Sequence, residues 1–207
     1  MLQQVMTAPG KIGFHEVPVP EISEGEVLIK IMKIGICGSD IHVYHGEHPF
    51  TSYPVTQGHE VSGEVVKTGR AVTGFVPGQK VTIQPQVVCG QCYPCRHGKY
   101  NLCEDLKVMG FQTTGAASHY FAVDAAKVTL LPQDMGHDEG AMIEPLAVAV
   151  HAVKQAGDVA GARKGTSSGR WEGGGGGGAW RGGGGGGGPG GCLFSPPLQL
   201  LQYDSSW

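Results

Sequence analysis

Four of the six cysteines lie close together in the pattern C-x2-C-x2-C-x7-C: Cys89, Cys92, Cys95 and Cys103. A C-x2-C turn directs two thiolates at one point, and four thiolates complete the tetrahedral shell of a structural zinc ion. Neighbours such as Arg96, His97 and Lys99 are typical of a loop, which disfavours the alternative of reduced cysteines packed as small apolar side chains. The spacing predicts a zinc lobe at residues 86–106 that does no chemistry, because its shell has no open position.

A second set of metal-binding residue types stands in ICGSDIH (36–42) and QGHEV (57–61). Cys37 offers a thiolate, His59 an imidazole and Glu60 a carboxylate, which together suit zinc and leave a fourth position for water or substrate. Such a site could activate a bound hydroxyl group. Taken singly, each of these residues is equally compatible with ordinary packing and hydrogen bonding, so the residue types alone leave both interpretations open.

The elements that position these groups follow from the hydrophobic pattern. Between residues 26 and 130, short runs rich in β-branched residues alternate with glycine-containing turns, which is typical of a mostly β barrel or sandwich. After Pro132 the chain becomes alanine-rich with helical spacing, and Pro145 indicates a break or a new helix start. His45 and His48, in YHGEHPF, are interpreted as solvated loop histidines.

Charge and hydropathy exclude several partners. A net charge of -3 with a pI near 6.3 gives no basic surface for nucleic acid or for an anionic membrane. The sequence contains neither a long apolar run nor the regions of a signal peptide. We therefore expect a cytoplasmic protein that acts on a small molecule, with no nucleic-acid partner and no membrane partner.

The chain resembles the zinc-dependent medium-chain alcohol dehydrogenases, and within them the polyol and threonine dehydrogenase branch. Their signature G-H-E-x2-G-x5-G-x2-V is met by Gly58, His59, Glu60, Gly63, Gly69 and Val72, and the four-cysteine lobe follows where expected. The resemblance covers residues 1–160 and implies a mostly β, GroES-like, partly open barrel with a few helices. It also implies one catalytic and one structural zinc, an NAD(P) cofactor, a small polyol or alcohol substrate, and a homo-oligomer for full-length members.

The resemblance assigns the metal ligands residue by residue. It makes Cys37, His59 and Glu60 ligands of the catalytic zinc, with Glu144 acting near the metal through its bound water or as an exchanging ligand. Asp40 would orient the His59 ring. The resemblance further implies that zinc favours the alkoxide form of the substrate, from which hydride leaves readily.

Proton transfer falls by the same resemblance on the segment that follows Cys37. Ser39 would accept the proton of the alcohol, and His42, three residues further on, would pass it to water. Catalytic roles are thus expected for Ser39, His42 and Glu144, and metal binding for the seven residues of the two clusters.

Residues 161–207 have a different composition, with glycine runs at 173–178 and 182–188. A nicotinamide-binding G-x-G-x-x-G loop requires an apolar strand before its glycines and a helix after them. Neither pattern flanks the glycines of this segment. We expect a disordered tail in place of the cofactor domain, through a truncated gene model or a frameshift, and hence a chain that is inactive alone. Reading the DNA in the other two frames tests this expectation.

Two alternatives accompany the dehydrogenase interpretation. A non-catalytic zinc-binding module or fragment is the first, because a metal site without a hydride acceptor cannot oxidise an alcohol. An arginine-glycine tail that binds nucleic acid is the second. It is disfavoured because Arg170 and Arg181 are too few, RGG units are not repeated, and the chain as a whole is acidic.

Overall fold

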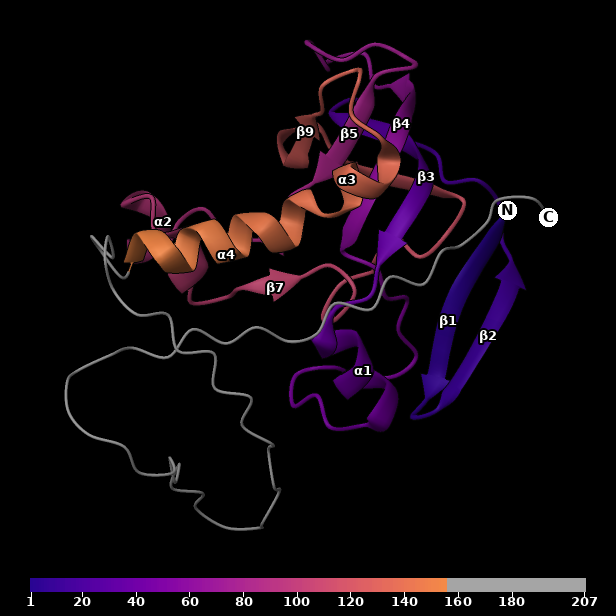
Figure 1. The fold of residues 1–207 in the computed structure, drawn as a ribbon, viewed down its shortest axis with the longest axis vertical. Coiled ribbons are helices and arrows are strands. Elements are labelled where there is room, and N and C mark those ends of the chain that lie inside the picture. The colour runs from indigo at the N-terminus through magenta and orange to yellow at the C-terminus, as the bar shows by residue number, and fades with distance from the viewer. Residues whose placement is uncertain (156–207) are drawn as a thin grey trace.

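The computed structural model of the protein describes residues 1–155, which form one five-stranded antiparallel sheet, two smaller sheets and several short helices (Figure 1). In spatial order, the strands of the main sheet are β8 (Tyr120–Asp124), β3 (Glu26–Gly35), β4 (Glu60–Thr68), β5 (Lys80–Ile83) and β9 (Val128–Leu130).

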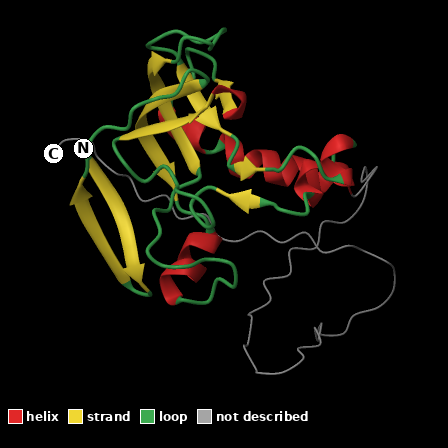
Figure 2. Ribbon diagram, turned by 180° about the vertical axis from the view of Figure 1, so that it is seen from behind, coloured by secondary structure: helices red, strands yellow, loops and turns green. Residues whose placement is uncertain are grey.

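Each of the two smaller sheets has two strands. Strands β1 (Leu2–Ala8) and β2 (Lys11–Glu16) form a hairpin that stands apart from the main sheet in Figure 2. Strands β6 (Gln86–Val87) and β7 (Lys107–Val108) form the base of the cysteine-rich lobe. The helices are α1 (Gly38–His45), α2 (Tyr93–Arg96), α3 (His137–Ala141) and α4 (Ile143–Gln155), with 3-10 turns η1 (Tyr100–Leu102) and η2 (Ala125–Lys127).

The main sheet is strongly curved. Its edge strands β8 and β9 are consecutive in the chain and are joined only by η2. Four steps from Asp124 to Val128 reach about 14 Å at most, whereas the edges of a flat five-stranded sheet would lie about 19 Å apart. The sheet therefore curls until its edges approach each other, which gives the partly open barrel expected from the sequence.

Alternation along each strand builds the core inside this curve. Side chains two positions apart point to the same face of a strand, and this face is fully covered. The buried residues of the strands are Val27, Ile29, Val61, Val65, Val81, Ile83, Phe121, Val123 and Val128. The mostly β architecture with a few helices is thus confirmed.

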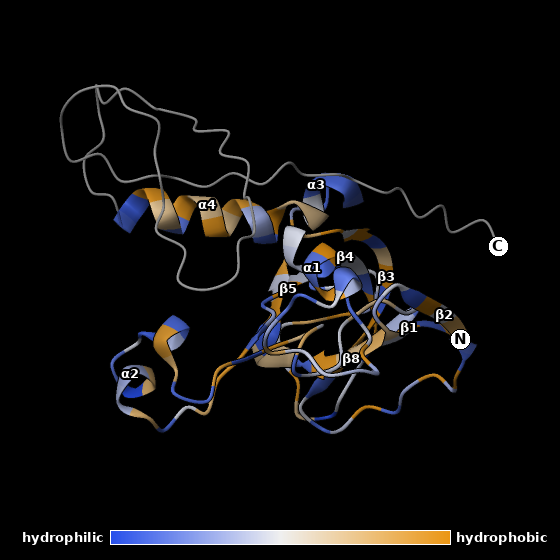
Figure 3. Ribbon diagram, turned by 90° about the horizontal axis from the view of Figure 1, so that it is seen from below, coloured by the Kyte–Doolittle hydropathy of each residue, from blue (hydrophilic) through white to orange (hydrophobic). Residues whose placement is uncertain are grey.

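The helical segment near the end of the described chain is divided in two. Helix α3 ends at Ala141 with Met142 as its C-cap, and α4 begins at Ile143 with Pro145 in its first turn, where no intrahelical N–H bond is lost. Helix α4 appears largely hydrophobic in Figure 3. Several of its apolar side chains are exposed: Leu146, Val148, Val150 and Val153. The predicted tail at 161–207 lies outside the described residues.

None of the helices within residues 1–155 has the length and apolar character needed to cross a membrane.

Close contact between β3 and β4 generates a testable prediction at Gly63. A Cβ atom there would collide with the carbonyl oxygen of Lys30 and lie 2.6 Å from Ile29 Cγ2. We expect Gly63→Ala to lower the free energy of unfolding by about 1–3 kcal/mol, measured by urea denaturation. Gly25→Ala is the matched control, since a Cβ at Gly25 meets nothing within 4 Å. Equal stability of the two variants would contradict this account of the strand contact.

Candidate metal centres

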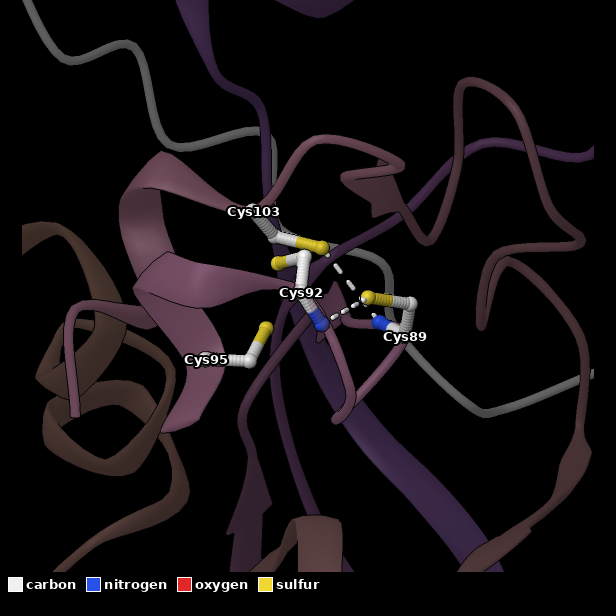
Figure 4. Close-up of side chains that lie close together, drawn as sticks. All are labelled: Cys89, Cys92, Cys95 and Cys103. Atoms are coloured by element: carbon white, nitrogen blue, oxygen red, sulfur yellow. Dashed lines mark hydrogen bonds between the residues drawn. The ribbon is translucent and has the colours of Figure 1, made fainter. Parts of the chain in front are cut away.

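The four cysteines of the lobe converge on one point. The Sγ atoms of Cys89, Cys92, Cys95 and Cys103 all lie within 4.8 Å of one another. Figure 4 shows their sulfur atoms gathered at the start of α2 and beside the segment that follows η1. The structure therefore brings together all four residues that the spacing selected.

Hydrogen bonds at this cluster favour the thiolate form of the cysteines, whereas burial favours the thiol form. The N–H groups of Cys89 and Cys92 donate to Cys103 Sγ and Cys89 Sγ over 3.3 and 3.4 Å. Backbone N–H groups of Glu104 and Cys95 lower the pKa of Cys92 to about 6, whereas burial raises the pKa of Cys95 to about 12. Four adjacent thiolates need a cation to neutralise them, and a soft divalent ion fits this donor set.

The second cluster joins the ends of two paired strands. Cys37 follows β3 and precedes α1, while His59 and Glu60 stand at the start of β4. The antiparallel register sets Gly35 opposite Glu60, so the end of one strand meets the beginning of the other. The donor atoms of Cys37, His59 and Glu60 consequently lie within 4.8 Å of one another.

Asp40 connects the two halves of this cluster. One oxygen, Oδ2, accepts the N–H of Cys37 at 3.0 Å, and the other, Oδ1, accepts Gln57 Nε2 at 3.0 Å. Oδ1 also lies 3.8 Å from His59 Nδ1. Burial raises the pKa of Asp40 to about 7. The carboxyl group therefore holds the Cys37 backbone and the Gln57 side chain, and it lies near the His59 ring without a hydrogen bond to it.

The electrostatics of the second cluster suit a bound cation. Burial raises the pKa of Cys37 and Glu60 and lowers the pKa of His59 to about 4. Two buried atoms, His59 Nδ1 and Glu60 Oε2, have no hydrogen-bond partner within residues 1–155. Over the same part of the chain, no lysine or arginine pairs with these groups. Because buried anionic groups are costly without a positive partner, the donor set fits a divalent metal ion.

The three residues with predicted catalytic roles lie at different depths. Glu144, in the first turn of α4, is half-buried, and burial together with the charge of Glu60 raises its pKa to about 7. Ser39 Oγ lies 3.8 Å from Cys37 Sγ. His42 is exposed and its Nδ1 lies 3.2 Å from Glu47 Oε2. Glu144 and Ser39 therefore border the cluster, while His42 reaches solvent.

Aromatic contacts beside the cluster were not indicated by sequence spacing. The Phe111 ring lies 5.0 Å from the His59 ring, and His48 stacks on Phe111 at 4.8 Å with an 18° angle between planes. Thr51 Oγ1 lies 2.7 Å from His48 Nδ1. His48 lies in a loop, and its ring is only partly exposed because it stacks on Phe111.

Comparison with known proteins identifies the class of this open, curved β-domain, which carries a four-cysteine lobe and a separate mixed-donor cluster of Cys37, His59 and Glu60. Residues 23–133 match the family described as "Alcohol dehydrogenase GroES-like domain". The chain belongs to the zinc-type alcohol and polyol dehydrogenase family, and it matches the N-terminal domain of its members.

Individual relatives support this membership. The chain is 42% identical to L-galactonate-5-dehydrogenase of Escherichia coli, over 69% of this chain and 41% of the relative. It is 38% identical to sorbitol dehydrogenase of Bacillus subtilis, over 73% and 44%. A zinc-binding dehydrogenase of Sinorhizobium meliloti, solved with NADP, superposes with a TM-score of 0.71 at 36% identity, over 75% of this chain and 45% of that one. The chain thus spans less than half the length of these relatives.

Metal analysis of variants tests the lobe. We expect about two zinc ions per chain, and Cys92→Ser should release the one in the lobe, because three thiolates leave the shell open. Inductively coupled plasma measurements give the stoichiometry. His97→Ala is the control, since His97 lies beside the lobe but its ring contacts the carbonyl of Tyr93. Unchanged zinc content in Cys92→Ser would contradict metal binding at the lobe.

The contact between Gly35 and Glu60 yields a second prediction at the mixed-donor cluster. A Cβ atom on Gly35 would lie 2.5 Å from Glu60 Oε2 and would push the carboxylate away from Cys37 and His59. We expect Gly35→Ala to weaken metal binding at this cluster about 10- to 100-fold, measured by competition with a chromophoric chelator. Gly25→Ala should keep the wild-type affinity, and an equal affinity in Gly35→Ala would argue against Glu60 as a ligand.

Proposed function

We propose that this chain carries the catalytic metal domain of a zinc-dependent dehydrogenase that oxidises an alcohol group of a polyol or simple alcohol to a ketone. The observation that carries the proposal is that the structure brings three different donors, Cys37, His59 and Glu60, close together. Two of them, His59 and Glu60, each have a buried side-chain atom that lacks a hydrogen-bond partner within residues 1–155. Membership of the zinc-type alcohol and polyol dehydrogenase family supports it.

The proposed reaction moves a hydride from the carbinol carbon to the nicotinamide of NAD(P)+ and releases the hydroxyl proton. A zinc ion held by Cys37, His59 and Glu60 would lower the pKa of a hydroxyl bound beside it. Asp40 keeps the Cys37 backbone in place through a hydrogen bond and lies 3.8 Å from His59 Nδ1. Glu144 supplies a further carboxyl group at the edge of the cluster.

Proton release is assigned to two residues of α1. Ser39, whose Oγ lies beside Cys37 Sγ, accepts the proton of the alcohol. His42 is exposed on the same helix, with its Nδ1 beside Glu47 Oε2, and carries the proton to solvent. These roles for Ser39, His42 and Glu144 follow from the family resemblance together with their positions.

A second candidate is a zinc-binding module without turnover of its own. One observation favours it: every strand pair within residues 1–155 is antiparallel, whereas the nicotinamide-binding fold is built on a parallel sheet with crossover helices. Under this candidate the full chain binds zinc at both clusters but cannot reduce a nicotinamide, as the glycine-rich composition of residues 161–207 suggests.

Turnover by the full chain distinguishes the two candidates. Zinc-loaded protein is incubated with sorbitol, xylitol or butanediol and NAD+ or NADP+, and reduced nicotinamide is followed by its absorbance. Turnover supports the dehydrogenase, and Ser39→Ala should then lower kcat about 10²- to 10⁴-fold, whereas Ser23→Ala, remote from both clusters, should not. Two bound zinc ions without turnover support the module. Absence of metal at Cys37, His59 and Glu60 would overturn both candidates.

A further inference from the structure

The His59 ring is buried, but no hydrogen bond at Nδ1 fixes its orientation. This atom has no hydrogen-bond partner within residues 1–155, and Asp40 Oδ1 lies 3.8 Å from it, beyond hydrogen-bond range. A metal-binding histidine is ordinarily fixed by a hydrogen bond of the ring nitrogen that does not face the metal. At His59, packing against neighbouring side chains has to supply this constraint.

The Phe111 ring packs directly against the His59 ring. The two ring centroids lie 5.0 Å apart, and the planes are inclined by 51°. Both side chains are buried, with 5% of His59 and 8% of Phe111 exposed. A ring in a close-packed interior cannot turn without displacing its neighbours. The position of Phe111 therefore limits the tilt of the His59 ring.

Two glycines allow these rings to meet. Gly58 precedes His59 and Gly110 precedes Phe111, and both glycines have positive φ angles, of 92° and 89°. A Cβ atom on Gly110 would lie 3.2 Å from the backbone nitrogen of Gly58. The N–H of Ala116 also donates to the carbonyl of Gly58 at 2.8 Å. The two backbones thus lie close together, and the side chains that follow them come into contact.

Phe111 is itself held in place by its surroundings. It belongs to a buried apolar cluster with Met6, Val43 and Val55. The His48 ring stacks on it at 4.8 Å with an 18° angle between planes, and Thr51 Oγ1 lies 2.7 Å from His48 Nδ1. A stack of two rings with one ring held by a hydrogen bond restricts the motion of both. Phe111 is consequently a fixed wall beside His59.

We propose that Phe111 is a positioning residue for the metal site, because its ring sets the tilt of His59 and hence the direction of the donor nitrogen. His48 steadies Phe111 through the stack. This role rests on the proposed function, since it requires the mixed-donor cluster to bind a metal ion. It adds an aromatic residue outside the donor set that determines how well this cluster holds its metal.

Cadmium-113 magnetic resonance of the full chain, loaded with cadmium in place of zinc, tests the proposal. The chemical shift of cadmium depends on the number of bound sulfur atoms and on bond geometry, so the lobe and the mixed-donor cluster give separate signals. We expect Phe111→Leu to shift the mixed-donor signal and to weaken zinc binding there about tenfold, measured by competition with a chromophoric chelator. The lobe signal should stay unchanged and serves as the internal reference.

Phe121→Leu is the matched control. The Phe121 ring is also 8% exposed, but it belongs to the main core of the barrel. This substitution should lower the free energy of unfolding as Phe111→Leu does, while leaving the mixed-donor signal and the zinc affinity as in the wild type. Equal effects of the two substitutions on the mixed-donor signal would overturn the role of Phe111, because the cause would then be a general loss of stability.

Substitutions at the half-buried His48 test the same role without removing a core side chain. We expect His48→Ala to weaken zinc binding at the mixed-donor cluster about threefold and His48→Phe to restore most of the affinity, because phenylalanine keeps a ring on Phe111. This pair carries the test if Phe111→Leu fails to fold.

Two further outcomes separate this role from the proposed function. A mixed-donor signal that is present and unchanged in both Phe111→Leu and His48→Ala would overturn the positioning role and leave the proposed function standing. A wild-type chain that shows only the lobe signal would overturn the proposed function, and the positioning role with it.

Discussion

The antiparallel pairing of β3 with β4 sets Gly35 opposite Glu60, and both the core and the mixed-donor cluster depend on this register. A slip by one residue would turn Val61 and Val65 away from the interior and would separate Cys37 from His59. The glycines at this contact are required because a side chain on Gly63 would collide with the carbonyl of Lys30. Backbone proximity between two central strands is thus the condition for bringing a thiol, an imidazole and a carboxylate into one place.

The same pairing concentrates groups that repel one another when ionised. Burial raises the pKa values of Cys37, Glu60 and Asp40. It also raises the pKa of Glu144, which reaches the cluster from α4. Within residues 1–155, the basic side chain near these groups is His59, and burial lowers its pKa. The fold tolerates this arrangement because the large apolar core of the β-barrel beside it stabilises the domain. An arrangement that is unfavourable for stability but precise in geometry is typical of a site selected for chemistry.

The sequence predicted the strands, the partly open barrel and the family, because each depends on short-range patterns such as alternation in β4 or the spacing of Gly58, His59 and Gly63. It also selected residues that the structure gathers into two clusters, although their ligand roles remain predictions. The link from Asp40 to Gln57 and the stack of His48 on Phe111 were not predictable, since each joins segments that only the tertiary fold brings together.

The lobe between β6 and β7 differs from the mixed-donor cluster in the sequence separation of its donors. The four cysteines from Cys89 to Cys103 lie in one short segment, so their sulfur atoms can come together around an ion while the remainder of the chain is still unfolded. Cys37 and His59 meet only after two long strands have aligned. If both clusters bind metal as proposed, the lobe of a newly synthesised chain would therefore fill first, and the mixed-donor cluster would fill last, after the barrel around it has formed.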